Sequence, residues 1–91
     1  MRYTVHKTGG RLDIRLSGEI DHHNACEARE KIDLILREER PERFGFDLSG
    51  VSFCDSSGLG LVMGRLKTCE SLGTAMVVVN PSDAVVRILH I

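Results

Sequence analysis

Apolar and polar positions alternate through the first twenty residues of the chain. Residues 3–5 and 12–16 both carry an apolar side chain at every second position, and Gly9 and Gly10 separate the two stretches. This alternation gives a strand one apolar face, and a glycine pair is typical of a tight turn. The pattern predicts a β-hairpin with one face turned inward.

The period lengthens after Ile20. From residue 24 to residue 39, apolar side chains recur every three or four positions and charged side chains occupy the other side. This spacing indicates an amphipathic helix, which we expect to end before Pro41. The residues of its apolar stripe are Ala25, Ala28, Ile32, Ile35 and Leu36.

The two-residue period returns at residues 44–48 and predicts a third strand. A second helix is expected to follow, to run to about Ser71 and to be closed by Gly73. The buried face of this helix is predicted from the spacing i, i+3, i+4, i+7. The residues with that spacing are Leu59, Val62, Met63 and Leu66.

Residues 75–79 form a short apolar run rich in valine. Such a run is typical of a strand covered on both faces, so we expect it inside the sheet. Asn80 and Pro81 predict a third helix, with Asn80 as its cap and Pro81 in its first position. The order β-β-α-β-α-β-α predicts one α/β domain with a mixed four-stranded sheet and flanking helices. Two strands have a polar side, so the helices are expected to cover the sheet unequally.

Composition narrows the class of protein. Ninety-one residues allow one domain, and no apolar run approaches the ~20 residues of a membrane span. The net charge is -1 and the basic residues are scattered, which argues against a direct nucleic-acid partner. The chain begins without the apolar stretch of a signal peptide, so we expect a cytoplasmic protein. Cys26, Cys54 and Cys69 lack a CxxC spacing and are expected to be reduced thiols.

Asp55, Ser56, Ser57 and Gly58 join the third strand to the second helix. These residue types favour a helix start, where the positive end of the helix dipole tolerates an anion such as phosphate. A cap without further function is one interpretation. A nucleophilic serine is disfavoured because small residues do not flank either serine as in GxSxG. A phosphate-binding loop is absent, since no Lys-Ser or Lys-Thr follows Gly58 at the required place.

Two further features require a physical reason. We expect Asp21, His22 and His23 to form an exposed polar loop, because adjacent histidines on a helix point about 100° apart and do not make the i, i+4 pair of zinc enzymes.

Gly60 and Gly64 each weaken a helix by about 1 kcal/mol relative to alanine. Either another backbone packs closely against them, or the surface is kept low for a partner protein.

Segments 17–23 (SGEIDHH) and 53–60 (FCDSSGLG) resemble two motifs of the STAS domain, which sulfate transporters and anti-sigma factor antagonists share. The likeness is strongest to the sporulation anti-anti-sigma factors of endospore-forming bacteria and extends over residues 1–91. It implies a sheet of four or five strands with flanking helices. Relatives usually continue through one more strand and helix, which we expect to be missing here.

The resemblance implies a partner-switching regulator that is not an enzyme and needs no cofactor or metal. In its unmodified form such a protein binds an anti-sigma factor that is also a GHKL-type serine kinase, and a sigma factor is released. Phosphorylation of the first serine of the motif, here Ser56, ends this association, and a PP2C-type phosphatase restores it. The free protein is expected to be a monomer. The residues expected to form the partner-binding surface are Glu19, Asp21, His22, His23, Asp55, Ser56, Ser57, Gly58 and Leu59.

Added charge gives this switch a physical basis. A phosphoserine adds about -1.5 to -2 charges, which the helix dipole offsets in part, so the domain need not unfold. A partner that must desolvate the phosphate beside Asp55 is excluded, and the sequence shows no arginine cluster that would neutralise it. Two other functions stay open. One is a STAS scaffold or sensor module of a stress-signalling complex or transporter; the other is a hydrolase using Ser56 or Ser57, for which no base is evident.

Overall fold

Strands and helices follow one another in the predicted order. The computed structural model describes residues 1–90 and contains one α/β domain. Its elements are β1 (Arg2–Thr8), β2 (Arg11–Ile20), α1 (His22–Glu39), β3 (Arg43–Cys54), α2 (Ser57–Leu72), β4 (Ala75–Val79) and α3 (Asp83–Leu89).

One sheet forms the centre of the fold, with its strands in the spatial order β1-β2-β3-β4. β1 and β2 pair antiparallel through a turn at Gly9, whose φ of 60° lies in the left-handed region that favours glycine. β2 is parallel to β3, and β3 is parallel to β4. The predicted mixed sheet of four strands is therefore confirmed.

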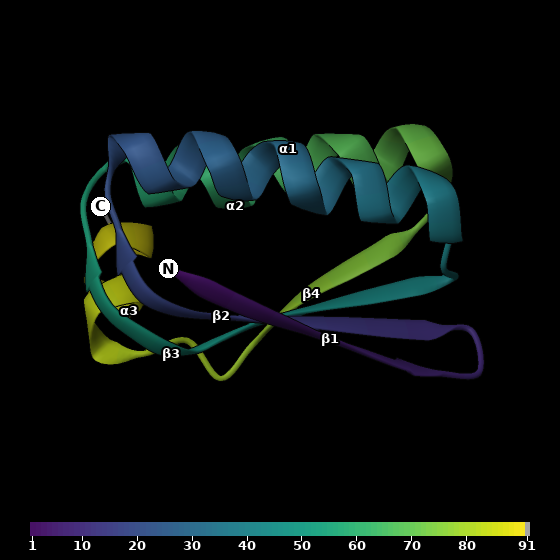
Figure 1. Cartoon of the computed structure of the whole chain (residues 1–91), viewed down its shortest axis with the longest axis horizontal. Coiled ribbons are helices and arrows are strands. Elements are labelled where there is room, and N and C mark those ends of the chain that lie inside the picture. Colours follow the sequence, from purple (N-terminus) through teal and green to yellow (C-terminus); the bar gives the residue numbers. More distant parts are fainter. Residues whose placement is uncertain (91) are drawn as a thin grey trace.

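α1 and α2 lie side by side over one face of this sheet, and α3 lies near the end of β3 (Figure 1). The last residues of β2 and β3, Ile20 and Cys54, are partners in register. The two long helices therefore begin at the same end of the sheet and run in the same direction. α2 ends at Gly73, as predicted. The uneven cover of the sheet is also confirmed.

The core lies between the sheet and the two long helices. Phe44 and Phe46 stack in it with their ring centroids 5.4 Å apart. The apolar stripe of α1 is buried as predicted, with Ile35 partly buried at its margin. The three cysteine thiols are free. Within residues 1–90, no helix combines the length and hydropathy that crossing a membrane requires. The buried apolar residues are Leu12, Ile14, Leu16, Ile20, Ala25, Ala28, Ile32, Leu36, Phe44, Phe46, Leu48, Val51, Leu61, Val62, Cys69 and Val85.

The buried face of α2 differs from the prediction. Leu59 and Met63, which were expected inside, are 36% and 48% exposed, and Leu66 is only partly buried. Another row of α2 faces inward, and that row contains Arg65, whose charge is paired with a carboxylate of α1. Because Arg65 interrupts the apolar spacing of this row, the spacing did not identify the row as the buried face. The residues of α2 that are buried are Gly58, Leu61, Val62, Arg65 and Cys69.

Two predictions for the last third of the chain are wrong. β4 is an outer strand of the described sheet, and Val77 is 50% exposed, so the valine-rich run has an open side. α3 is capped by Ser82, whose hydroxyl accepts a hydrogen bond from the Val85 amide at 3.4 Å. Asn80 has a left-handed φ of 46° and belongs to the turn before the helix, because such a conformation suits asparagine in turns.

Candidate functional site

The two sequence motifs meet where β2 and β3 end. The Asp55 amide donates a hydrogen bond to the Ile20 carbonyl at 3.1 Å, which ties the second motif to the first. Asp21 and Asp55 therefore precede two neighbouring helices at the same end of the sheet. The predicted site residues that the structure places around these two helix starts are Glu19, Asp21, His22, His23, Asp55, Ser56, Ser57, Gly58 and Leu59.

α2 begins with a hydrogen-bonded turn built on Asp55. The carboxylate oxygen Oδ1 accepts hydrogen bonds from the Ser57 hydroxyl and, at 2.8 Å, from the Ser57 amide. These two bonds hold the pKa of Asp55 below its usual value, and the charge of His22 lowers it further. The Asp55 side chain is therefore ionised at neutral pH.

Ser56 stands at the cap position of α2 but does not cap it through its side chain. Its backbone is already helical, with φ of -63° and ψ of -18°, and its hydroxyl makes no hydrogen bond within residues 1–90. Ser56 is exposed, whereas Ser57 is half-buried. The start of α2 therefore presents a free hydroxyl on Ser56 beside an engaged hydroxyl on Ser57.

The start of α1 has a different construction. Asp21 Oδ1 accepts a hydrogen bond from the Asn24 amide at 2.8 Å and so satisfies one of the free donors of the first turn. The helix begins at His22, so the expectation of a polar loop at residues 21–23 is wrong, although both histidines are exposed. The helix starts earlier than predicted because the Asp21 cap holds its first turn. Within residues 1–90, no cluster of three or more His, Cys, Asp or Glu side chains is arranged to hold a metal ion.

Gly58 allows α2 to lie directly on the end of β3. The residue is buried, and a Cβ at this position would overlap the Sγ atom of Cys54. Burial, and then the charge of Asp55, raise the pKa of the Cys54 thiol, so this thiol stays protonated at neutral pH. A larger residue than glycine would require the Cys54 side chain or the helix start to move.

Gly60 and Gly64 lie on open sides of α2. A Cβ at either position would meet no atom within 4 Å, so close packing of another backbone in the described chain does not explain them. The other interpretation, a surface kept low, is the one that fits. Leu59 and Met63 precede the two glycines and are large, exposed apolar side chains. A contiguous surface of this kind is typical of a protein docking site.

A buried ion pair joins α1 to α2, and it was not predicted from the sequence. Arg65 is 3% exposed, and its Nε lies 2.8 Å from Asp33 Oδ1. Its Nη1 also donates a hydrogen bond to the Leu61 carbonyl at 3.4 Å. Burial lowers the pKa of Arg65, and the charge of Asp33 opposes this shift. The only sequence signal is that Arg65 lies four residues from both Leu61 and Cys69, in the row that faces inward.

A groove of about 280 Å³ lies between the first halves of α1 and α2, and we call it the interhelical groove. Small residues on both helices make the hollow, Ala25 and Cys26 on α1 and Gly60 on α2. Arg29 and Arg65 bring two positive charges to it. The residues that line the groove are His22, Ala25, Cys26, Arg29, Ser57, Gly60, Leu61 and Arg65.

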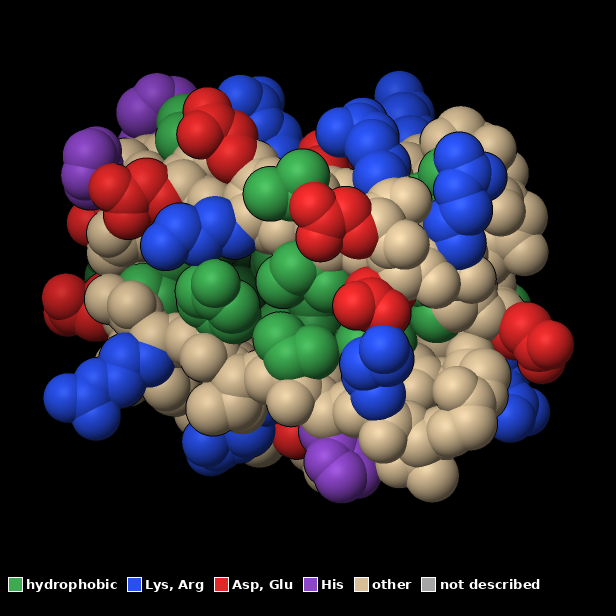
Figure 2. Space-filling view, turned by 45° about the vertical axis from the view of Figure 1, so that its right-hand side comes forward, with side chains coloured by type: hydrophobic (Ala, Val, Ile, Leu, Met, Phe, Trp, Pro, Cys, Tyr) green, Lys and Arg blue, Asp and Glu red, His purple; other side chains and the backbone are tan. Residues whose placement is uncertain are grey.

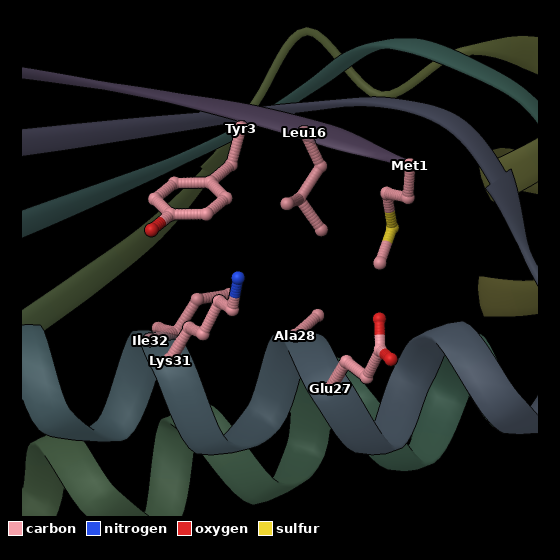
Figure 3. A pocket seen from close by; sticks show the side chains of 7 residues that line it. All are labelled: Met1, Tyr3, Leu16, Glu27, Ala28, Lys31 and Ile32. Carbon is pink, nitrogen blue, oxygen red and sulfur yellow. The ribbon is translucent and has the colours of Figure 1, made fainter.

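A second, smaller hollow of about 60 Å³ lies where α1 faces β1, and side chains from both sides point into it (Figure 3). The Lys31 ammonium lies 5.5 Å from the centre of the Tyr3 ring. In the space-filling view, apolar side chains are recessed between the helical layer and the sheet and are surrounded by charged groups (Figure 2). None of the predicted site residues lines this hollow. Its lining residues are Met1, Tyr3, Leu16, Glu27, Ala28, Lys31 and Ile32.

Fold and motifs together define the class of protein. Residues 2–91 match the STAS domain, and the chain therefore belongs to the STAS domain family. The resemblance drawn from segments 17–23 and 53–60 is thus confirmed.

The similar proteins include regulators named for anti-sigma factors. An anti-sigma F factor antagonist from Lysinibacillus sphaericus is 37% identical over 77 residues, which are 85% of this chain and 66% of the relative. The chain thus spans about two thirds of the length of that protein.

Two solved structures share the fold. The anti-sigma factor antagonist SpoIIAA in its unphosphorylated form is 31% identical, with a TM-score of 0.81 over 98% of this chain and 78% of that chain. The Bacillus cell fate determinant SpoIIAA in the phosphorylated form is 30% identical, with a TM-score of 0.76 over 98% and 81% of the two chains.

Proposed function

We propose that this protein is an anti-sigma factor antagonist that works by partner switching. In its unphosphorylated form it binds an anti-sigma factor that is also a GHKL-type serine kinase, and the sigma factor held by that kinase is released. Phosphorylation of Ser56 ends the association, and a PP2C-type phosphatase restores it. The observation that carries the proposal is the free, exposed Ser56 hydroxyl at the start of α2. The similar proteins that are named for this activity, one of them solved in a phosphorylated form, also support it.

The hydrogen bonds of the helix start favour Ser56 over Ser57 as the modified residue. The Ser57 hydroxyl donates to Asp55 Oδ1 and is half-buried, so a kinase would first have to break this bond. The Ser56 hydroxyl is exposed and makes no hydrogen bond within residues 1–90, so it is open to transfer of a phosphoryl group. Ser57 then has a structural role in the turn.

Local charge explains how phosphorylation would block docking without unfolding the domain. A phosphate on Ser56 would stand beside the ionised Asp55, while the dipole of α2 offsets part of the new charge. Arg65 is buried and already paired with Asp33, so it is not free to neutralise this phosphate. A partner surface would have to desolvate the uncompensated charge, and association would weaken roughly several-hundred-fold.

The outer surface of α2 supports docking at the same place. Leu59 and Met63 expose apolar side chains next to Gly60 and Gly64, so a partner could approach the helix closely and bury apolar area. Leu59 is three residues from Ser56 along the chain. The docking surface and the modified hydroxyl are therefore one continuous region.

Binding to the anti-sigma kinase of the same organism tests the proposal. We expect Ser56→Ala to bind with wild-type affinity in titration calorimetry, and Ser56→Asp to bind roughly several-hundred-fold more weakly because it mimics part of the phosphate charge. After incubation with the kinase and Mg-ATP, mass spectrometry is expected to find phosphate on Ser56 in the wild type and in Ser57→Ala. Equal affinity of the aspartate and alanine variants, or phosphate on Ser57, would contradict the proposal.

A further inference from the structure

The interhelical groove contains positive charge that the fold leaves uncompensated. Arg65 in its wall is 3% exposed and pairs with Asp33 of α1. Arg29 is exposed, has no ion-pair partner within residues 1–90, and lies near enough for its charge to act on Arg65. The charge of Arg65 is therefore paired, and the charge of Arg29 is not paired within residues 1–90.

The helix dipoles and the carboxylates at the helix starts oppose each other at the end of the groove. α1 and α2 begin side by side, so the positive ends of both helix dipoles lie at one end of the groove. Asp21 and Asp55 stand at these starts, and their Oδ1 atoms accept hydrogen bonds from Asn24 and Ser57. The groove lining within residues 1–90 contains two arginines, one histidine and no carboxylate, although the whole chain has a net charge of -1. The groove is a local basic site in a nearly neutral domain.

The shape of the groove depends on Gly60. A Cβ at this position would touch nothing within 4 Å, so the fold itself does not require glycine there. Glycine weakens a helix, and its presence where the fold tolerates alanine indicates a need for space on the outer side. The opening of about 280 Å³ has room for a side chain from another molecule.

We infer that the interhelical groove receives an acidic side chain, aspartate or glutamate, of the protein partner, and that Arg29 binds its carboxylate. Ser57 lines the groove and is next to Ser56, so the groove and the apolar residue Leu59 belong to one docking surface around the start of α2. An arginine in such a recess binds a carboxylate with two parallel hydrogen bonds, and water is partly excluded. The inference rests on the proposed function, because the partner must dock over the start of α2.

Arg29→Gln and Arg37→Gln form a matched pair of variants for the test. Both positions are exposed on α1 and both substitutions remove one positive charge, but Arg37 lies in the last turn and does not line the groove. Affinity for the anti-sigma kinase of the same organism is measured by titration calorimetry at low and high salt. We expect Arg29→Gln to bind roughly tenfold more weakly than wild type, and Arg37→Gln to stay within about twofold of it.

The salt series identifies the contact as electrostatic. The affinities of wild type and Arg37→Gln are expected to fall more steeply with NaCl than the affinity of Arg29→Gln. Equal affinities and equal salt slopes for the two variants would overturn the inference and leave the proposed function intact, provided that Ser56→Asp still blocks binding. If the wild-type protein did not bind the kinase, the proposed function and the inference would both fail.

Discussion

α1 and α2 lie next to each other on the same sheet and begin at the same end, but they follow the local rules of helix formation to different degrees. α1 has a side-chain cap on Asp21, a continuous buried apolar stripe and no glycine. α2 begins at a serine with an unused hydroxyl, contains Gly60 and Gly64, buries Arg65 and exposes Met63. Apart from Leu34, which is 57% exposed, folding alone explains α1. The departures on α2 coincide with the proposed docking surface, as is expected where function competes with local preference.

The largest expected effect tests the ion pair that both helices share. Asp33→Ala would leave the Arg65 guanidinium buried without its carboxylate, and we expect the free energy of unfolding to fall by about 3 kcal/mol. Urea denaturation followed by circular dichroism measures this change. Glu30→Ala is the control, because Glu30 is exposed on α1 and forms no ion pair within residues 1–90. It is expected to change stability by less than about 0.5 kcal/mol.

A double substitution separates loss of a partner from loss of packing. Asp33→Leu combined with Arg65→Met removes both charges and keeps apolar volume between the helices. We expect the double variant to be about as stable as the wild type, because an apolar pair often replaces a buried ion pair without loss. A double variant as unstable as Asp33→Ala would show that the ion pair is needed for packing as well as for charge balance.

The same substitution at the two helix starts is expected to give different results. Asp21→Ala removes the hydrogen bond to the Asn24 amide and should destabilise the protein by about 1 kcal/mol. Ser56→Ala removes no hydrogen bond within residues 1–90 and should change stability by less than about 0.5 kcal/mol. Thermal or urea unfolding measures both. Equal losses at the two starts would mean that Ser56 is a structural cap after all.

Filling a glycine on α2 is expected to stabilise the fold. At Gly64, a Cβ meets no atom within 4 Å, so Gly64→Ala should raise the free energy of unfolding by about 0.5 to 1 kcal/mol through helix propensity. Chemical denaturation measures the gain. A loss of stability instead would indicate that another part of the chain packs against this position.

The smallest expected effect is the pH dependence contributed by Asp55. Its pKa is lowered in the folded protein, chiefly by the hydroxyl of Ser57, from the usual aspartate value of 3.8. Its contribution to stability is therefore complete above about pH 4 and is lost as the pH falls through the lower, folded-state pKa. Unfolding of wild type and Asp55→Asn at several pH values between neutral and acid is the measurement. The difference in stability between them should shrink below pH 3.8, and a constant difference would contradict the assigned hydrogen bonds.

Strands and helices in which apolar side chains recur at a regular spacing were predictable from the sequence. The hairpin and α1 were found because one side of each carries a regular apolar pattern. The predicted inward face is correct for β2 but wrong for β1, because β1 is exposed along its whole length and Tyr3 and Val5 are 42% and 43% exposed. The inward row of α2 was not, since the burial of Arg65 depends on Asp33 from another helix, and such pairing has no signal in a single segment. β4 was misplaced because a valine run looks the same in an inner strand and in an outer strand with one open side.

The candidate site was predictable in its position but not in its details. Residue types located the helix start at Asp55 and the neighbouring motif at Asp21, and the parallel strands bring the two together. The side chain of Asp55 accepts its hydrogen bonds from Ser57, so the Ser57 hydroxyl is engaged and the Ser56 hydroxyl is free. The sequence does not show which serine Asp55 contacts. The interhelical groove arises only when α1 and α2 lie side by side, so no local pattern predicts it.

β4 gives the sheet a preferred direction for adding strands. The segment Ala75–Val79 has no charged residue and no proline, whereas the opposite outermost strand contains Arg2 and Lys7. Charged side chains discourage the addition of a neighbouring chain, and a neutral strand offers its unpaired amides and carbonyls as a template. β4 also pairs only with the first part of β3, residues 43–47. A newly recruited strand would therefore extend the sheet on that flank and leave the end of the domain that carries Ser56 accessible.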